Sequence, residues 1–253
     1  MALYLVGIGL GGAKDITLKG MEAVKKADKV YLECYTSILN CDVKELEQAL
    51  GCTVTLADRE LVEKKAESTI LQSAMDGDAV LLVIGDPLVA TTHTDLMLRA
   101  QKAKIPVHVV HNASVVSAIG ATGLQVYKFG KTASIPFAEK DYVPETPYQI
   151  LAENQKHGAH TLLLLDLWPQ EKKFMTVNDA IECLLKLELK LNGKVFTRDT
   201  LCVGIARLGA EDPQIIAGKA KDLLTKDFGK PVHCLVVPGK MHFMEEEFLQ
   251  QFR

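Results

Sequence analysis

Three glycines near the start of the chain, Gly7, Gly9 and Gly12, fit the pattern G-x-G-x-x-G within the segment LYLVGIGLGGAKDITLKG. At the end of a strand, this spacing is typical of loops that bind the pyrophosphate of a dinucleotide at a helix N-terminus. Glu33 closes the next apolar run, where such folds place an acidic residue for the ribose. The glycine pattern alone is weak evidence, because short motifs of this kind are frequent.

Asp15 argues against a dinucleotide site. The helical periodicity begins near Thr17, so no helix N-terminus would face a bound pyrophosphate. The carboxylate of Asp15 would also repel the phosphates. We therefore interpret the glycines as a loop that lets the backbone approach something else, and a nucleotide-dependent oxidoreductase is left as a remote alternative.

Two further polar loops are predicted at strand ends. In VIGDPLVATTHTD, Gly85 and Pro87 enforce a turn after the most apolar strand and hold Asp86 between them. In HNASVVSA, Asn112 or Ser114 is placed to cap a short helix. A turn and a cap explain these residues without a ligand. Because ligands of open α/β sheets bind beyond the carboxyl ends of the strands, the three loops together indicate one shared pocket.

Short apolar runs alternate with amphipathic segments as far as Asn112, which predicts a mostly parallel sheet with helices on both faces. The strands expected in this half are 3–9, 29–33, 52–57, 79–85 and 106–110. The expected helices are 18–27, 43–50, 60–75 and 92–103. The fold class is therefore α/β.

The second half is richer in strands, which are expected at 160–167, 199–209, 214–218 and 231–239. A helix over 175–191 begins with Thr176 and Asp179, a plausible capping box, and another helix closes the chain at 242–252. Pro144 and Pro147 mark the segment before the first of these strands as loop. The acidic residues of MEEEF are expected to form a solvated face. We place the two domains at residues 1–112 and 113–253.

Composition restricts the class of protein. Of 253 residues, 48% are hydrophobic and 24% charged, and the net charge of −3 disfavours nucleic acid as the main partner. The longest apolar runs are strand-sized, and the chain does not start with a signal peptide, so we expect a cytoplasmic protein without membrane contact. The six cysteines are expected to be free buried thiols. His108 and His111, three positions apart on an expected strand, would face opposite sides and share no metal ion.

Taken together, the motifs resemble those of the diphthine synthase family. The segments that carry the resemblance are LYLVGIGLGGAKDIT, VYLECYTS, VIGDPLVATTHTDL, VHNASVVSAIGATGLQVYKFGKTASI and DTLCVGIARLGAEDPQIIAG. They run through nearly the whole chain in order, whereas the first and third alone would indicate only the broader tetrapyrrole methylase superfamily. The resemblance implies two unequal α/β domains of the tetrapyrrole methylase type, with S-adenosylmethionine bound in a cleft between them and no metal.

The resemblance also implies site residues and a reaction. Transferred motif by motif, it implies cofactor contacts at Leu10, Asp86, Val89, Ser114, Val115, Leu165, Leu208 and His233. The implied reaction methylates the amine of a 3-amino-3-carboxypropyl-modified histidine on translation elongation factor 2 and releases S-adenosylhomocysteine. Methyl transfer from a sulfonium requires alignment more than acid or nucleophilic catalysis, so no catalytic residue is assigned, although Asp86 and Asp166 are conceivable proton acceptors.

Two further implications follow from the resemblance, and one alternative to it stays open. Members of the superfamily commonly form homodimers, so a homodimer is expected here. The eukaryotic enzymes tend to carry an insertion where this chain has only LWPQEKKF, so the chain resembles the shorter archaeal type. The alternative is another methylase of the same fold that acts on a corrinoid or on ribosomal RNA.

Overall fold

The computed structural model describes residues 1–138 and 143–253, which divide into two compact units. The first unit comprises Met1–Val115 together with Gly209–Glu211. The second comprises Val116–Leu208 and Asp212–Arg253. This division lies close to the boundary expected after Asn112. The return of 209–211 to the first unit could not be expected, since a segment so short has no compositional signature.

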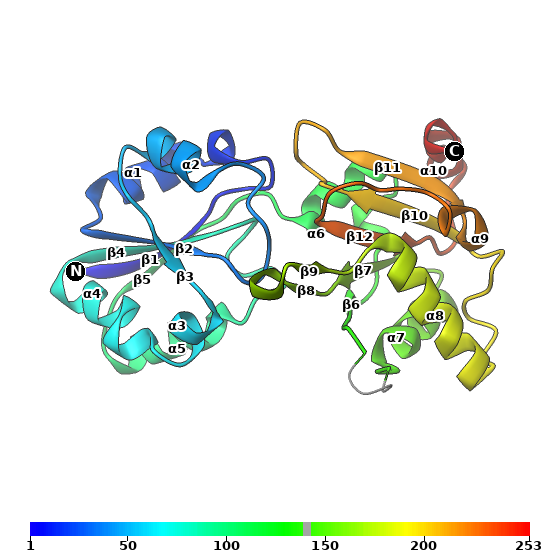
Figure 1. Ribbon diagram of the computed structural model, residues 1–253, viewed down its shortest axis with the longest axis horizontal. Helices are drawn as coiled ribbons and strands as arrows, with labels where there is room; N and C mark the ends of the chain where they lie inside the picture. The colour runs from blue at the N-terminus through cyan, green and yellow to red at the C-terminus, as the bar shows by residue number, and fades with distance from the viewer. Residues whose placement is uncertain (139–142) are drawn as a thin grey trace. The chain divides into compact units, whose positions relative to one another are not determined.

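A parallel five-stranded sheet forms the centre of the first unit, in the order β3-β2-β4-β1-β5 (Figure 1). Its strands are β1 (Ala2–Gly7), β2 (Lys29–Glu33), β3 (Thr55–Ala57), β4 (Asp78–Val83) and β5 (Val107–Val110). The registers Gly7↔Val83 and Val6↔Val110 place the carboxyl ends of the three neighbouring strands β4, β1 and β5 at one level. The mostly parallel sheet expected from the alternating pattern is therefore confirmed.

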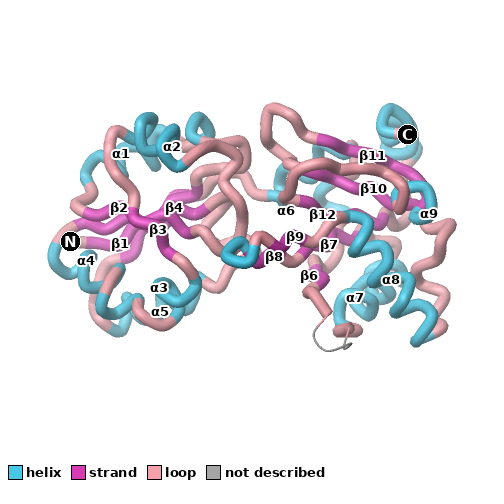
Figure 2. Tube along the Cα trace, viewed as in Figure 1, coloured by secondary structure: helices cyan, strands magenta, loops and turns pink. Residues whose placement is uncertain are grey.

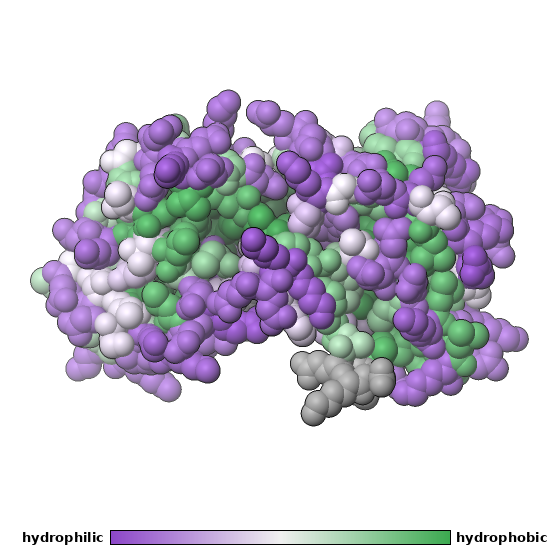
Figure 3. Space-filling model, in the orientation of Figure 1, coloured by the Kyte–Doolittle hydropathy of each residue, from purple (hydrophilic) through white to green (hydrophobic). Residues whose placement is uncertain are grey.

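Helices cover both faces of this sheet (Figure 2). On one face lie α1 (Leu18–Lys26) and α2 (Val43–Leu50), and on the other lie α3 (Arg59–Glu63), α4 (Ile70–Asp76) and α5 (His93–Lys102). Each face has its own apolar core, as expected for strands that are buried on both sides. Figure 3 shows hydrophilic residues on the outer surfaces of the helices that it displays and apolar residues over edge strand β3, where Leu56 is exposed.

Two details of the first unit concern helix ends. Helix α1 begins as expected, because the Thr17 hydroxyl accepts a hydrogen bond from Gly20 N at 3.0 Å. The single helix expected over 60–75 is wrong: α3 and α4 are separated by a 3₁₀ turn. In that turn the hydroxyls of Ser68 and Thr69 both donate to Lys65 O, a local bond that competes with the helical ladder.

The second unit is built on a mixed sheet in the order β11-β10-β12-β7-β6. Its strands are β6 (Ala133–Ile135), β7 (Thr161–Leu165), β10 (Leu201–Ala206), β11 (Gln214–Lys219) and β12 (His233–Val237). Only β6 and β7 pair in parallel within this sheet, and the other pairs are antiparallel. A separate two-stranded hairpin, β8 (Leu167–Trp168) and β9 (Lys173–Phe174), follows β7.

The helices of the second half include two that the sequence did not predict. The helices are α6 (Val115–Ala118), α7 (Thr146–Lys156), α8 (Val177–Leu191), α9 (Ala220–Leu223) and α10 (Phe243–Leu249). The two that were not predicted are α7 and the short α9. The capping box of Thr176 and Asp179 at the start of α8 is confirmed. Helix α7 lies in the segment expected to be loop. Pro147 stands in its first turn, where a missing N–H costs nothing, so this proline does not break the helix. The remainder of the expected loop includes 139–142, which lie outside the described residues.

The expectation that MEEEF is a solvated acidic face is wrong at Glu245, whose side chain is only 1% exposed. One carboxylate oxygen of Glu245 accepts hydrogen bonds from Gln125 N and His160 Nε2, at 2.8 and 2.9 Å. The other accepts from Lys128 Nζ and His242 N. The network connects three segments: Gln125 and Lys128 come from the turn that precedes β6, His160 comes directly before β7, and His242 and Glu245 come from the start of α10.

Charge and burial fix the ionisation states in this network. Burial by itself raises the pKa of Glu245, but the hydrogen bonds from Gln125, Lys128, His242 and His160 outweigh it and hold the pKa at about 2. Burial lowers the pKa of His160 more than the Glu245 carboxylate raises it. His160 Nδ1 accepts a hydrogen bond from Gly239 N, so the imidazole is neutral with its proton on Nε2.

We expect the stability to fall on acidification in two steps. As the pH falls below about 6.5, the unfolded chain takes up a proton at His160 that the folded chain excludes, so unfolding is favoured. Glu245 stabilises the fold fully above its ordinary pKa of about 4.5, and that stabilisation is lost as the pH falls towards 2. Chemical denaturation between pH 8 and pH 2 measures both steps.

The variant Glu245→Gln should lose about 3 kcal/mol of unfolding free energy at neutral pH, because it leaves Lys128 without its buried counter-charge. It should also lose the lower of the two acid steps. Glu247→Gln, an exposed position on the same helix, is the control. Equal stability of the two variants would contradict the role given to the network.

Candidate functional site

The expected site residues of the first unit gather where β1, β4 and β5 end. Leu10 follows β1, Asp86 and Val89 follow β4, and Ser114 and Val115 follow β5. The three strands are neighbours in the sheet, so their loops emerge side by side at its carboxyl edge. The structure therefore places the loops that carry these five residues side by side, and the shared pocket expected from them stays a prediction.

The carboxylate of Asp86 binds two of these loops together. It is 6% exposed, and its Oδ1 accepts a hydrogen bond from Leu88 N at 2.9 Å. Its Oδ2 accepts from His111 Nδ1 at 2.8 Å and from Asn112 N at 3.2 Å. Burial raises the pKa of Asp86, but the three hydrogen bonds outweigh it and hold the pKa below its ordinary value. Asp86 is therefore an ionised positioning group for the loops after β4 and β5.

Asn112 connects the third loop and was not among the expected site residues. Its Nδ2 donates to Gly7 O at 2.9 Å and to Asp15 O at 3.0 Å, so it joins the end of β5 to the loop after β1. Its Oδ1 accepts from Ala113 N. Of the two expected caps, Asn112 does not cap α6, because its Oδ1 accepts from Ala113 N outside the helix, whereas Ser114 lies directly before the first residue of α6. The signal in the sequence was an asparagine just after a strand. It was interpreted as a helix cap, so its role in connecting two loops was missed.

The side chain of Asp15 packs against the backbone of Gly9 and Gly11 in the opening loop. Its Oδ2 accepts a hydrogen bond from Gly11 N at 2.7 Å. A Cβ atom on Gly9, whose φ is +73°, would come within 2.6 Å of the Asp15 Cβ. An internal carboxylate thus lies against the backbone that a pyrophosphate would need. The interpretation of the glycine motif as something other than a dinucleotide cradle is confirmed.

Glu33 likewise does not serve a ribose. Its side chain is fully buried, and Oε1 accepts hydrogen bonds from Tyr35 N and Thr36 N, each at 2.7 Å. Oε2 accepts from the Thr36 hydroxyl at 2.6 Å. These hydrogen bonds stabilise the turn after β2, so the role of Glu33 is structural.

Leu10 lies against two glycines of the first unit. A Cβ on Gly209, with φ +89°, would approach Leu10 Cβ to 2.6 Å, and one on Gly85, with φ +81°, would lie 3.7 Å from Leu10 Cδ2. Gly85 also lies beside the backbone of Ser114, which is 6% exposed. Val89 is half-buried in the turn that Asp86 holds, and its N–H donates to Asp86 O. The surface of these loops therefore consists of apolar side chains that pack closely against the backbone of neighbouring loops.

The other three expected residues gather within the second unit. His233 pairs with Ala206 at the end of β10, so Leu208, two positions further on, lies at the same edge of the sheet. Leu165 ends β7, which pairs with β12 in the register Cys234↔Leu164. All three thus lie at one edge of the mixed sheet, where β7 and β10 end and β12 begins.

His233 offers an acceptor atom that nothing described in the structure uses. It is 5% exposed, and its Nε2 donates to Lys230 O at 3.0 Å. Its Nδ1 is buried and has no hydrogen-bond partner among the described residues. Burial lowers the pKa of His233 despite the bond to Lys230, so the ring is neutral at neutral pH. A buried lone pair of this kind fits a ligand that donates a hydrogen bond, such as an amino or hydroxyl group.

Other candidate groups have structural roles. Asp166 accepts hydrogen bonds from Phe137 N and Leu167 N, each at 2.9 Å. His108 stacks on Tyr4 at 4.9 Å between ring centroids. The premise that His108 and His111 share a strand is wrong, since β5 ends at Val110 and His111 bonds to Asp86. Among the described residues no three His, Cys, Asp or Glu side chains are grouped to hold a metal, and no helix has the length and apolar character to cross a membrane.

The six cysteines are free thiols, as expected, although only Cys202 and Cys234 are buried and the other four are half-buried. Burial raises the pKa of the Cys202 thiol, and it raises that of Cys234 to about 12. Both of these cysteines are therefore inert thiols of the core.

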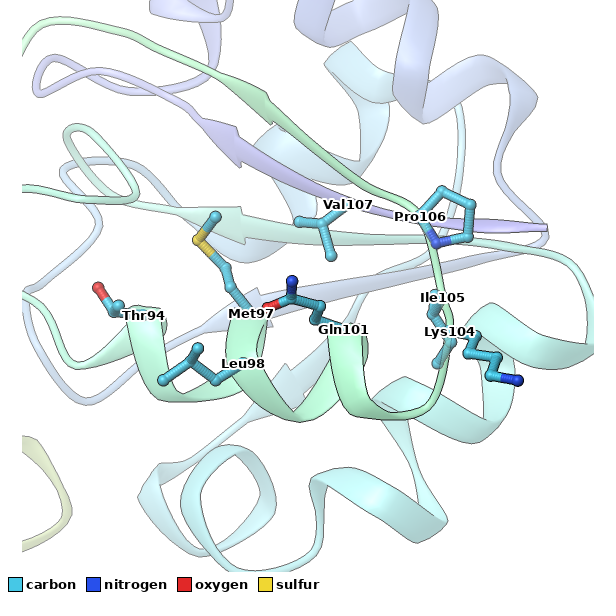
Figure 4. Close-up of a pocket in the computed structure, with 8 residues that line it drawn as sticks. All are labelled: Thr94, Met97, Leu98, Gln101, Lys104, Ile105, Pro106 and Val107. Atoms are coloured by element: carbon cyan, nitrogen blue, oxygen red, sulfur yellow. The ribbon is translucent and has the colours of Figure 1, made fainter.

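A groove of about 480 Å³ lies apart from these loops, between α5 and β5 (Figure 4). Met97 on the helix and Val107 on the strand point into it from opposite sides. The groove is lined by Thr94, Met97, Leu98, Gln101, Lys104, Ile105, Pro106 and Val107. None of the expected site residues is among them, and Lys104 is the only ionisable side chain, so the groove is not the candidate active site.

Comparison with known proteins identifies the class. The family model of the tetrapyrrole (corrin/porphyrin) methylases matches residues 2–224, and the chain belongs to this family. Membership makes it an S-adenosylmethionine-dependent methyltransferase, the enzyme class that the resemblance implied. The oxidoreductase alternative is thereby excluded.

Relatives over the full length narrow the identification. The chain is 48% identical to the diphthine synthase of Methanococcus aeolicus, over 98% of this chain and 96% of that one. It is 44% identical to the diphthine methyl ester synthase of Dictyostelium discoideum, over 100% of this chain and 98% of that one. A crystal structure of a diphthine synthase superposes with a TM-score of 0.90 at 38% identity, over 100% of this chain and 96% of that one. The resemblance to the diphthine synthases is confirmed, and so is the two-unit α/β fold.

Replacement of Asp86 by asparagine should weaken the binding of S-adenosylhomocysteine at least tenfold. The new amide nitrogen would meet the N–H of Asn112 donor to donor, so the loops after β4 and β5 would separate. Isothermal titration calorimetry measures the affinity, with Asp76→Asn on the surface of α4 as the control. An unchanged affinity would show that these loops take no part in binding.

His233→Phe keeps an aromatic ring and removes both ring nitrogens, the free Nδ1 acceptor and the Nε2 donor to Lys230 O. We expect the same titration to show an affinity loss of about tenfold, the usual worth of one buried hydrogen bond. His157→Phe, at an exposed position of the same unit, should bind as the unchanged protein does. If the two variants bind equally well, His233 is only a structural residue.

Proposed function

We propose that this protein transfers methyl groups from S-adenosylmethionine to the amine of a 3-amino-3-carboxypropyl-modified histidine on translation elongation factor 2, a step in diphthamide biosynthesis. The observation that carries the proposal is the similarity to a diphthine synthase at 48% identity over 98% of the chain. Relatives that match along their full length favour this substrate over a corrinoid or ribosomal RNA, which are the acceptors left open by the fold.

The residues at the strand ends fit the proposed cofactor. S-adenosylmethionine, when bound, supplies a methyl group on a positively charged sulfur. Leu10 and Val89 offer apolar surface of the kind that an adenosine needs, and Leu10 lies against the backbone turn at Gly85. The carboxylate of Asp15 in the opening loop suits a cationic ligand and opposes a phosphate. Leu165, Leu208 and His233 remain predicted contacts from the second unit.

The proposed reaction depends chiefly on how this protein positions its substrates. Before each transfer the acceptor ammonium gives up one proton to solvent, and the neutral amine then forms an N–C bond as the S–C bond of the sulfonium breaks. Asp86 uses both carboxylate oxygens for loop hydrogen bonds, and its lowered pKa makes it a poor proton acceptor. Asp166 uses both of its oxygens for backbone N–H groups. The role of both residues is therefore to hold the loops in place, while alignment provides the rate enhancement.

We propose methylation at nitrogen, without the additional ester. The alignment with the Dictyostelium relative, named a methyl ester synthase, runs over 270 positions against the 253 residues of this chain. The alignment with the Methanococcus relative runs over 249 positions. The connection between β7 and α8 is correspondingly short here, being little more than the hairpin β8–β9. These lengths support the shorter type.

The test is a methyl-transfer assay with mass spectrometry on elongation factor 2 that carries the 3-amino-3-carboxypropyl histidine. The expected product has three added methyl groups, and the unmodified factor should gain none. A fourth methyl group would assign the ester reaction instead. If neither form of the factor gains a methyl group although S-adenosylhomocysteine still binds tightly, the proposed substrate is wrong and the assignment to the methyltransferases stands.

A homodimer and a cytoplasmic location belong to the same proposal. The homodimer rests on analogy with the superfamily, and the location rests on the strand-sized apolar runs of the sequence. Sedimentation equilibrium would test the dimer. A mass of 27.7 kDa at micromolar concentration would contradict it.

A further inference from the structure

Two aromatic rings of the second unit enclose a lysine ammonium group. Lys173 Nζ lies 4.1 Å from the ring centroid of Phe137 and 4.2 Å from that of Trp168. The two rings meet edge to face, with 5.1 Å between their centroids and 66° between their planes. Two rings at this distance from one cation form two walls of an aromatic cage.

The fold holds these two rings in a fixed arrangement. Trp168 and Lys173 are direct cross-strand partners in the β8–β9 hairpin, which lies beside β7 in Figure 1. Phe137 comes from the segment after β6, and its N–H is held by Asp166 Oδ2 at 2.9 Å. Asp166 Oδ1 holds Leu167 N, the residue before Trp168. One carboxylate therefore holds the backbone at Phe137 and directly before Trp168, and the two rings already meet edge to face without a ligand.

The present occupant is not the cation that such a cage binds best. A primary ammonium is strongly hydrated, and Lys173 is an exposed residue on a flexible stem, so leaving the rings costs it little. A methylated ammonium is weakly hydrated and spreads its charge over its methyl groups, which is why aromatic cages recognise quaternary ammonium ions. Phe137 and Trp168 are only half-buried, so a ligand can reach them.

We propose that Phe137 and Trp168 form a binding site for methylated ammonium groups, which Lys173 occupies in the free protein and vacates when such a ligand binds. The inference rests on the proposed function, in which one acceptor amine is methylated repeatedly. The site retains the partly methylated amine while spent cofactor is exchanged for fresh cofactor. Its place in the chain agrees with this role, because Trp168 follows Leu165, an expected cofactor contact, by three positions.

A purely structural role for the same three residues makes the opposite prediction. If Lys173 only clasps the hairpin, its removal loosens Trp168 and weakens any binding at the rings. If Lys173 occupies a ligand site, its removal leaves that site open and strengthens binding. The variant Lys173→Met separates the two, because methionine keeps the length of the side chain and loses the charge.

Fluorescence titration with tetramethylammonium chloride tests the site without reference to the reaction. Trp168 is the only tryptophan of the chain, so its emission reports directly on the cage. We expect a saturable change that ammonium chloride at equal ionic strength does not produce. The apparent Kd should fall at least threefold in Lys173→Met and rise at least threefold in Phe137→Leu. Lys186→Met, on the exposed side of α8, is the charge-matched control.

Either of two results would overturn the site. One is a titration of the unchanged protein that does not saturate or that ammonium reproduces. The other is a Lys173→Met variant whose affinity for tetramethylammonium is unchanged or weaker. Circular dichroism of each variant shows whether it is folded. If Phe137→Leu does not fold, Phe137→Tyr, which keeps a ring, replaces it. The affinity of Phe137→Tyr for tetramethylammonium should stay within twofold of that of the unchanged protein.

The product distribution tests the proposed role. With modified elongation factor 2 in excess, Trp168→Leu should raise the ratio of mono- and dimethylated to trimethylated product at least threefold, whereas Tyr127→Leu, at an exposed aromatic residue, should not. Equal ratios in the unchanged protein and Trp168→Leu would overturn the retention role. If the unchanged protein transfers no methyl group at all, the proposed function fails, and the fluorescence titration still decides whether the cation site exists.

Discussion

The buried carboxylate of Asp86 is the contact on which the rest of the first unit's site depends. Parallel strands that end at one level leave loops with no regular partner, and their backbone N–H groups must be satisfied locally. Asp86 satisfies those of Leu88 and Asn112, and Asn112 in turn holds the end of β1. Three loops that are distant in sequence thus acquire one geometry through two polar side chains.

The sheet of the first unit could be predicted because it depends on local pattern. Continuous apolar runs separated by amphipathic segments indicate strands buried on both faces, and this is what β1 and β4 are. The pattern failed where side chains compete with the backbone, as at Thr69, and where a proline is tolerated, as at Pro147 in α7. The sequence around Thr69 does not show that its hydroxyl bonds to the backbone, and the sequence around Pro147 does not show that the proline lies in the first turn of a helix and not in a loop.

The candidate site was only partly predictable for a different reason. Loops with small and polar residues after strands can be recognised in the sequence. The hydrogen-bond partners of these residues cannot, because the partners lie far away along the chain. Asn112 reaches Gly7 over 105 positions and Glu245 reaches Gln125 over 120, and no periodicity encodes such distances. For the same reason an acidic run near the chain end could not be separated into exposed carboxylates and the buried one.

Asp15 has a consequence for the selection of cofactors. Cells contain nucleoside triphosphates and dinucleotides in abundance, and glycine-rich loops after a first strand are where many folds take them up. Here the loop is already occupied by an anion that belongs to the chain, bound to Gly11 N at 2.7 Å. A carboxylate that belongs to the chain therefore disfavours anionic competitors at this loop, whatever their concentration in the cell.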